Sequence, residues 1–123
     1  MSNKILVVDD SRTIRQQVGT ALVRAGYEVV EAEDGVQGLR EITARRDLAL
    51  VICDINMPNM NGLEMLAAVK ADAANASLPV VMLTTEGKTE TIQQAKKSGA
   101  KGWVIKPFNP DQLLAAVRKI VGS

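Results

Sequence analysis

The sequence has 123 residues, of which 46% are hydrophobic and 24% are charged, and its formal net charge is +1. This length and balance predict one ordinary soluble domain over residues 1–123, and they exclude a polyanion-binding protein, a disordered tail and a membrane-inserted protein. The chain has a single cysteine, Cys53, and no histidine. An intrachain disulfide and histidine-based nucleophile pairs are therefore excluded, a transition-metal site is disfavoured, and a reducing, cytoplasmic location is the simplest interpretation.

The first half of the chain alternates short apolar runs with helical patterns. Residues 4–8 and 27–30 are typical of strands. Between them lies a helical pattern that ends at Gly26, and its inward positions are Ile14, Val18, Ala21, Leu22 and Ala25. Asp34 stands three residues before Gln37, which is the spacing of a capping box and predicts the start of the next helix.

The second half repeats this alternation. Strands are expected at residues 48–53, 79–83 and 103–105. Residues 62–69 begin one helix, and a second helix contains Ile92 and Ala95 and ends at Gly99. Asn109 precedes Pro110, a pair that caps and begins a last helix, whose inner face holds Leu113, Leu114, Val117, Ile120 and Val121.

Five strand–helix units in this order predict an α/β fold. Parallel strands with right-handed crossovers give a flavodoxin-like, doubly wound, five-stranded sheet in the order 2-1-3-4-5. In such sheets ligands bind at the carboxyl ends of the strands, near the switch point between the first and third strands. The residues at those ends are therefore the first candidates for a site.

The expected strand ends carry acids, hydroxyls and a lysine. Asp9 and Asp10 follow the first strand, Asp54 the third, Thr84 the fourth and Lys106 the fifth. Two carboxylates about 5 Å apart repel by roughly 3 kcal/mol at an effective dielectric of 20, so such a cluster calls for a cation. Mg²⁺ prefers carboxylates, waters and phosphate oxygens, which predicts a magnesium-dependent phosphoryl site.

Four motifs resemble the receiver domain of bacterial response regulators. They are Val7-Val8-Asp9-Asp10-Ser11, Asp54-Ile55-Asn56-Met57-Pro58, Leu83-Thr84-Thr85-Glu86 and Lys106-Pro107-Phe108. The order and spacing of the motifs match over essentially the whole chain. The resemblance is closest to stand-alone chemotaxis regulators of the CheY type.

The resemblance implies roles for the acids and their neighbours. Asp54 is expected to be the phosphoacceptor. The Mg²⁺ ligands are expected to be Asp10 directly, Asp9 largely through water, Asp54, and the backbone carbonyl of Asn56. Asn56 and Glu86 occupy the positions that tune attack by water and hence the phosphoryl lifetime.

The resemblance also implies a switch. Thr84 is expected to bond to the phosphoryl group, and Lys106 to pair first with Asp54 and then with the phosphate. The Lys106–Pro107 peptide bond is expected to be cis. Trp103 occupies the aromatic switch position, and the alternation of side chains along a strand turns it away from Lys106.

The expected function is a switch rather than an enzyme, acting only on its own phosphorylation and dephosphorylation. The expected partners are a CheA-like sensor histidine kinase and a downstream protein that binds the last helices and strand, with no DNA contact and a monomeric state. A phosphorelay carrier or a kinase-regulating receiver remains an alternative to a motor-binding regulator. A magnesium-dependent phosphatase is less favoured because its Asp-x-Asp motif is absent, and a flavin module because acids follow the first strand.

Overall fold

The computed structural model describes residues 3–45, 47–85 and 89–121. Its sheet has five parallel strands in the order β2-β1-β3-β4-β5, which confirms the predicted flavodoxin-like fold. The strands are β1 (Lys4–Val8), β2 (Glu28–Ala32), β3 (Leu48–Asp54), β4 (Val80–Thr84) and β5 (Gly102–Ile105). The order places β1 beside β3 in the middle of the sheet, so their carboxyl ends are neighbours.

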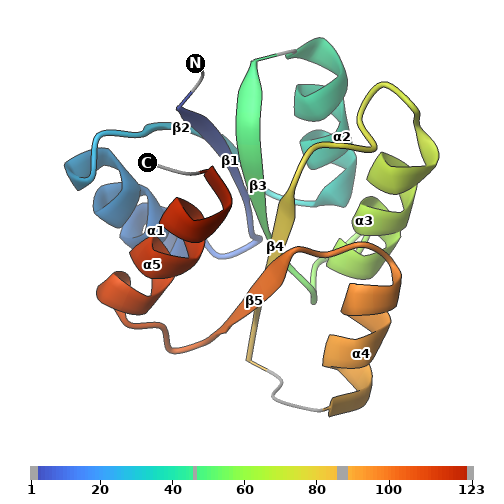
Figure 1. Ribbon diagram of the computed structural model, residues 1–123. Coiled ribbons are helices and arrows are strands. Elements are labelled where there is room, and N and C mark those ends of the chain that lie inside the picture. The colour runs from blue at the N-terminus through green and yellow to red at the C-terminus, as the bar shows by residue number, and fades with distance from the viewer. Residues whose placement is uncertain (1–2, 46, 86–88, 122–123) are drawn as a thin grey trace.

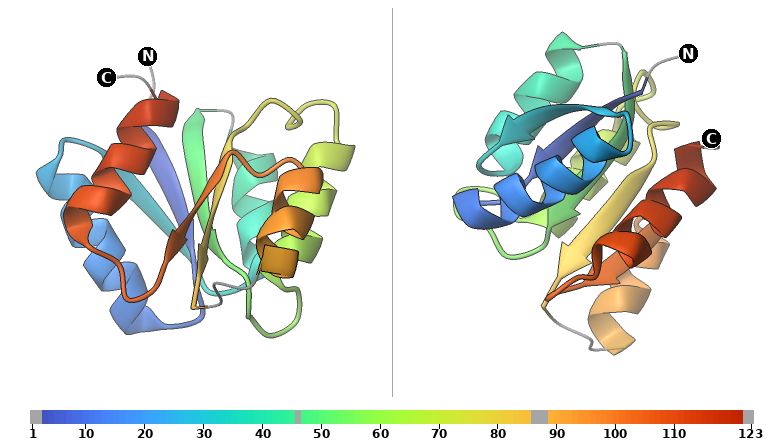
Figure 2. Two further views of the ribbon diagram at one scale, coloured as in Figure 1. Left: turned by 60° about the horizontal axis from the view of Figure 1, so that its bottom comes forward. Right: turned by 90° about the vertical axis from the view of Figure 1, so that its left-hand side faces the viewer.

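Five helices connect or follow these strands and cover both faces of the sheet. They are α1 (Arg12–Arg24), α2 (Gly35–Ala44), α3 (Gly62–Ala71), α4 (Thr89–Lys97) and α5 (Pro110–Val121). In Figure 1, α1 and α5 lie on one side of the sheet and α2, α3 and α4 on the other. Figure 2 shows that β1 begins and α5 ends at the same end of the sheet, opposite to the carboxyl ends of the strands.

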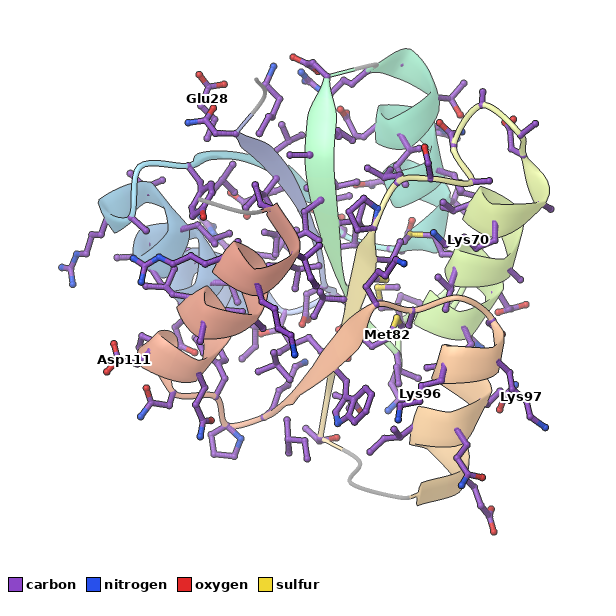
Figure 3. The ribbon with its side chains drawn as sticks, viewed as in Figure 1. Glu28, Lys70, Met82, Lys96, Lys97 and Asp111 are labelled. Carbon is purple, nitrogen blue, oxygen red and sulfur yellow. The ribbon has the colours of Figure 1, made fainter. Side chains whose placement is uncertain are left out.

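The alternation of side chains along the strands divides the core into two layers. Ile5, Val7, Ile52 and Leu83 pack beneath α1 and α5. The other face buries, among others, Leu6, Val8, Val51, Cys53 and Met82, the last of which is labelled in Figure 3. Because both faces of the sheet are covered, β3 and β4 are apolar almost throughout, as the sequence predicted. Within the part of the chain that the structure describes, no helix is long and apolar enough to cross a membrane.

The second strand differs most from its sequence pattern, whereas β3 and β5 are each one residue longer than predicted. The pattern predicts residues 27–30, but β2 spans Glu28–Ala32 because Glu31 and Ala32 pair in register with Val7 and Val8. Glu31 interrupts the apolar pattern without interrupting the backbone ladder, and this strand lies at the edge of the sheet where a polar side chain reaches solvent.

The predicted helix starts are confirmed, with one change in detail. The side chain of Asp34 accepts a hydrogen bond from the backbone N–H of Gln37. The Gln37 side chain accepts from the backbone of Glu33 rather than from that of Asp34, so the reciprocal bond of a capping box is displaced by one residue. Asn109 accepts a bond from the backbone N–H of Asp111 at the start of α5.

Candidate functional site

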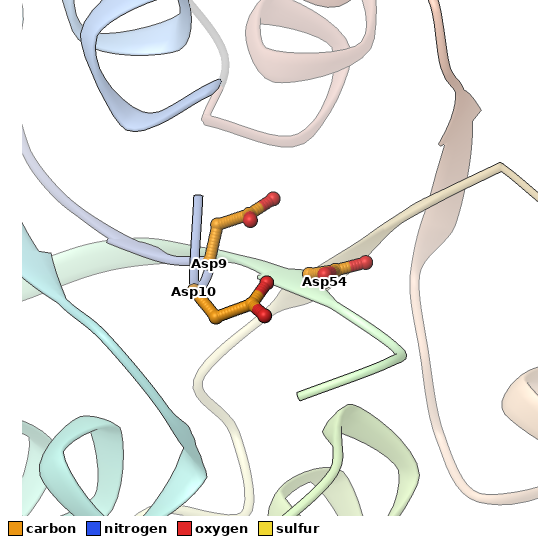
Figure 4. Close-up of side chains that lie close together, drawn as sticks. All are labelled: Asp9, Asp10 and Asp54. Carbon is orange, nitrogen blue, oxygen red and sulfur yellow. The ribbon is translucent and has the colours of Figure 1, made fainter. Parts of the chain in front are cut away.

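Three carboxylates gather at the carboxyl ends of β1 and β3. Asp9 and Asp10 follow β1, and Asp54 is the last residue of β3 (Figure 4). Each offers one oxygen, and these oxygens all lie within 4.8 Å of one another. Asp9 and Asp54 are buried, whereas Asp10 is exposed. The cluster therefore presents oxygen ligands that open to solvent on the side of Asp10.

Lys106 lies against two of these acids. Its Nζ donates to Oδ2 of Asp9 at 2.9 Å and lies 3.3 Å from Oδ1 of Asp54. The pairing with Asp54 that the resemblance implies is present, but the shorter contact of Lys106 is to Asp9. The backbone N–H of Lys106 donates to the carbonyl of Thr84 at 2.7 Å, and the peptide bond from Lys106 to Pro107 is cis. The contacts of Nζ place the ammonium group beside the carboxylates of Asp9 and Asp54.

The pKa values of Asp54 and Lys106 reflect this crowding. Burial raises the pKa of Asp54, and the negative charge of Asp9 raises it further, while Lys106 acts in the opposite direction. Burial works against the charge of Lys106, but the hydrogen bond to Asp9 and the negative charge of Asp54 outweigh it and raise the pKa of Lys106. The ammonium group is therefore held charged and compensates part of the negative charge.

Asp9 is fixed from several directions. Its Oδ1 accepts from the backbone N–H of Ser11 at 2.8 Å, and its Oδ2 accepts from Lys106. Its own N–H donates to the carbonyl of Ala32 at 3.1 Å. Both carboxylate oxygens of Asp9 thus have protein donors, which suits a ligand that acts through water better than one that binds a cation directly.

The loop after β3 forms hydrogen bonds with residues at the starts of α2 and α3. The N–H of Gly62 donates to the carbonyl of Ile55 at 2.8 Å. A Cβ at Gly62 would lie 2.1 Å from the carbonyl oxygen of Asp54, so only glycine allows α3 to begin this close to β3. Nδ2 of Asn59 donates to Oδ2 of Asp34 at 2.7 Å, and Asn59 has a φ of 66°. Asn56, in the same loop two residues after Asp54, is exposed.

The hydroxyl and aromatic candidates lie on β4 and β5. Thr84 is the last residue of β4 and is buried, and Thr85 after it is exposed. Trp103 is half-buried and packs on the face covered by α2, α3 and α4. Nζ of Lys96, on α4, lies 4.6 Å from the centroid of its ring (Figure 3 labels Lys96). Glu86 lies outside the described residues, so its expected role stays a prediction.

Sequence reasoning missed Arg15. This arginine on α1 is only 9% exposed, and it bonds to the main chain of Asp9. A signal was present, because Arg15 stands three residues before Val18 and seven before Leu22, two buried positions of the same helix. A charged residue on the apolar stripe of an amphipathic helix calls for a buried partner.

Comparison with known proteins gives a consistent result. The family profile described as "Response regulator receiver domain" matches residues 5–118. Chemotaxis protein CheY1 of Helicobacter pylori is 40% identical over 121 residues, which cover 98% of this chain and 98% of that protein. The CheY homolog of Campylobacter jejuni is 39% identical, with 98% and 93% coverage.

Solved structures agree with these relatives. The chemotaxis response regulator CheY4 of Vibrio cholerae superimposes with a TM-score of 0.91 at 42% identity, covering 98% of this chain and 99% of that one. A CheY-like receiver domain protein of Methanospirillum hungatei has a TM-score of 0.90 at 28% identity, with 98% and 94% coverage.

Proposed function

Since the chain belongs to the response-regulator receiver family of two-component signalling, we propose that it is a phosphorylation switch whose acceptor is Asp54. The proposal takes residues 1–123 as one receiver domain that works in the cytoplasm as a monomer. The names of the relatives favour chemotaxis or a related chemosensory pathway. Family membership also favours a receiver over the phosphatase and the flavin module.

The observation that carries the proposal is the acidic cluster under Lys106. Carboxylate oxygens within 4.8 Å of one another, in a chain with no histidine, are a ligand set that suits Mg²⁺ and does not suit zinc or copper. Asp10, Asp54 and the backbone carbonyl of Asn56 would hold the ion, with Asp9 acting through water. When bound, the ion supplies positive charge beside the carboxylates and the phosphoryl oxygens.

The residues of the chain divide the transfer among them. A carboxylate oxygen of Asp54 forms a new P–O bond while the P–N bond of the kinase's phosphohistidine breaks, and the histidine nitrogen keeps the bonding electrons and takes up a proton. Lys106 and the Thr84 hydroxyl donate hydrogen bonds to the phosphoryl oxygens, where preorganised donors are most effective. Asp54 is buried at the end of a central strand, so its nucleophilic oxygen is held in one place.

We further propose how the signal enters and leaves the domain. A CheA-like sensor histidine kinase donates the phosphoryl group. Thr84 then moves toward it, Trp103 turns inward, and the face formed by α4, β5 and α5 changes shape for a downstream protein. Because Trp103 lies on β5 and contacts Lys96 of α4, a change in its ring position reaches this face directly.

The acceptor assignment is tested with acetyl phosphate and Mg²⁺, followed by intact-protein mass spectrometry. We expect the wild type to gain one phosphoryl group and Asp54→Asn to gain none. Asp111→Asn is a matched control, because it removes an exposed carboxylate from the first turn of α5 and should leave phosphorylation unchanged. Phosphate incorporation by Asp54→Asn would refute the site. Transfer from each histidine kinase of the source organism would then identify the donor.

The lifetime of the phosphoryl group is a separate expectation. Asn56 and Glu86 stand two residues after Asp54 and Thr84, and both are polar enough to orient an attacking water. We expect a short-lived, CheY-like phosphoryl state. Phosphate release is measured after the donor is removed, and persistence over hours would count against the role of this pair.

A further inference from the structure

Arg15 is a buried cation beside the acidic cluster, yet its role in the site is not explained by charge pairing with the acids. It lies on the sheet side of α1 with a side chain that is 10% exposed. Burying a guanidinium group is costly unless its donors find acceptors in good geometry. The groups that accept hydrogen bonds from Arg15 are therefore the groups that its side chain fixes in position.

The guanidinium group joins the turn after β1 to the edge strand β2. Its Nη1 donates to the backbone carbonyl of Asp9 at 2.6 Å, in a buried hydrogen bond. Its Nε donates to Oε1 of Glu31 on β2 at 2.9 Å. The carbonyl of Asp9 belongs to the peptide unit that connects Asp9 to Asp10, so a donor fixed on this oxygen fixes the plane of that peptide.

The orientation of this peptide plane determines where Asp10 lies. Asp10 is the exposed member of the acidic cluster, and its position depends on the backbone that Arg15 holds. Its neighbour Asp9 is already fixed through its side chain by Ser11 and Lys106. Arg15 adds a restraint on the main chain. Its bond to the Asp9 carbonyl fixes the backbone that leads to Asp10.

We propose that Arg15 is a positioning residue for the cation site, because it fixes the Asp9–Asp10 peptide and so preorganises the Asp10 carboxylate. This inference rests on the proposed function, in which Asp10 binds Mg²⁺. Some groups orient metal ligands through hydrogen bonds without touching the metal. Removing such a group typically weakens metal affinity about 10- to 100-fold. We therefore expect Arg15→Gln to raise the Mg²⁺ dissociation constant by about 10- to 100-fold.

A positioning role and a purely electrostatic role of Arg15 predict opposite changes in the Mg²⁺ dissociation constant of Arg15→Gln. Arg15 is positive, so if it acted only through space its removal would reduce repulsion and tighten Mg²⁺ binding. If it positions Asp10, its removal weakens binding. Arg24→Gln is the matched control, because it removes an exposed arginine from the last turn of the same helix and reports the effect of the change in net charge.

The experiment is calorimetric titration of the unphosphorylated protein with Mg²⁺, together with the rate of phosphorylation by acetyl phosphate over a range of Mg²⁺ concentrations. For Arg15→Gln we expect weaker binding and a phosphorylation rate that recovers at saturating Mg²⁺. Arg15→Lys keeps the charge and one donor toward the Asp9 carbonyl, so its dissociation constant should lie between those of the wild type and Arg15→Gln. Urea unfolding without metal measures the separate structural effect of each change.

The outcomes separate this inference from the function on which it rests. A dissociation constant for Arg15→Gln equal to or below that of Arg24→Gln overturns the positioning role and leaves the receiver function standing. If Arg15→Gln does not fold, Arg15→Lys decides: weakened Mg²⁺ binding supports the role, and unchanged binding overturns it. A wild-type chain that binds no Mg²⁺ overturns the proposed function and this inference together.

Discussion

Asp54 is the residue at which stability and the proposed function conflict most directly. Its side chain is buried next to Asp9, and both burial and the neighbouring charge disfavour its ionised form. Ionisation is nevertheless what a nucleophilic carboxylate requires. Lys106 relieves part of this conflict, and a bound cation would relieve more.

Replacing Asp54 with Asn should stabilise the metal-free protein. Because the pKa of Asp54 is raised in the folded state, ionisation costs folded-state stability as the pH rises above the ordinary aspartate value of about 3.9. We expect Asp54→Asn to raise the free energy of unfolding at pH 7 by on the order of 1 kcal/mol. The gain should shrink as the pH falls from the raised folded-state pKa of Asp54 toward its ordinary value, and it should vanish below about 4, where Asp54 is protonated in both states.

Urea unfolding at several pH values, in the presence of a chelator, measures this effect. Asp10→Asn is the comparison, since Asp10 belongs to the same cluster but is exposed, and its gain should be smaller. A metal-free Asp54→Asn protein that is less stable than the wild type at pH 7 would show that the bond to Lys106 outweighs the repulsion from Asp9.

At the scale of single residues, the sequence predicted groups whose chemistry is visible in a motif. Asp9, Asp10, Asp54, Thr84 and Lys106 all stand at strand ends, and parallel topology brings such ends together. It did not predict residues that act through the backbone. The apolar stripe of α1 indicates that Arg15 is buried but does not reveal its partner, the backbone carbonyl of Asp9, and the bond between Asp34 and Asn59 depends on a left-handed residue far away in the chain.

At the scale of elements, Gly62 sets how closely α3 approaches β3. An added Cβ would lie 2.1 Å from the carbonyl oxygen of Asp54, and the obstacle is backbone that cannot rotate away. We expect Gly62→Ala to lower the free energy of unfolding by about 3 kcal/mol, at the upper end of typical overpacking costs. It should also slow phosphorylation, because relief of the clash must move Asp54 or its loop.

Gly102→Ala is the control for this prediction. A Cβ at Gly102, on β5, meets no atom within 4 Å, so its effect on stability should stay within about 0.5 kcal/mol. Urea unfolding of both variants and their phosphorylation by acetyl phosphate provide the comparison. Equal stability of Gly62→Ala and the wild type would mean that the loop between β3 and α3 adapts without cost.

Element positions were predictable because each βα unit repeats the same physical signals. Apolar runs set the strands, and glycine or a capping side chain set the ends of the helices, as at Gly26 and Gly99, which both have positive φ. The hydrophobic pattern of the sequence did not predict the end of a strand where backbone pairing, and not side-chain burial, keeps a residue in the strand. Glu31 is polar and half-exposed, yet it remains in β2 because Val7 on β1 holds it in register.

The contact between α4 and β5 supplies a prediction about the switch. Lys96 lies over the ring of Trp103 at 4.6 Å, and such a contact at an exposed site is worth about 0.5–1 kcal/mol. In the proposed mechanism the ring must leave this position when it turns inward. Lys96→Met should therefore raise the population of the inward state, and so the apparent affinity for beryllofluoride with Mg²⁺, by about two- to fivefold.

Emission of Trp103, the only tryptophan, measures this shift during the titration. Lys97→Met is the matched control, because Lys97 is the next residue of α4 and points away from the sheet (Figure 3). Asp54→Asn should abolish the response in every background. If emission and quencher access of the wild type do not change on activation, Trp103 is a fixed contact and the switch runs through the loop after Thr84.

At the scale of the whole molecule, the site joins strands that are distant in the chain. Asp9 and Asp10 follow β1, Asp54 ends β3, and Lys106 follows β5, so the cluster exists only when the sheet is complete. An ion that binds this cluster binds the folded state and not the unfolded chain. Binding therefore adds RT ln(1 + [Mg²⁺]/Kd) to the free energy of unfolding, about 2.7 kcal/mol at 100 times the dissociation constant.

This linkage predicts that Mg²⁺ reverses the order of stability between the wild type and Asp54→Asn. Without the ion, Asp54→Asn should be the more stable protein because it lacks one repelling charge. As Mg²⁺ is added, the wild type should gain stability steadily, whereas Asp54→Asn and Asp10→Asn gain less because each has lost a ligand. Urea unfolding over a range of MgCl₂ concentrations, with KCl keeping the ionic strength constant, separates binding from general screening. Curves that rise in parallel for all three proteins would mean that the ion acts elsewhere on the surface, and that the acidic cluster is not its site.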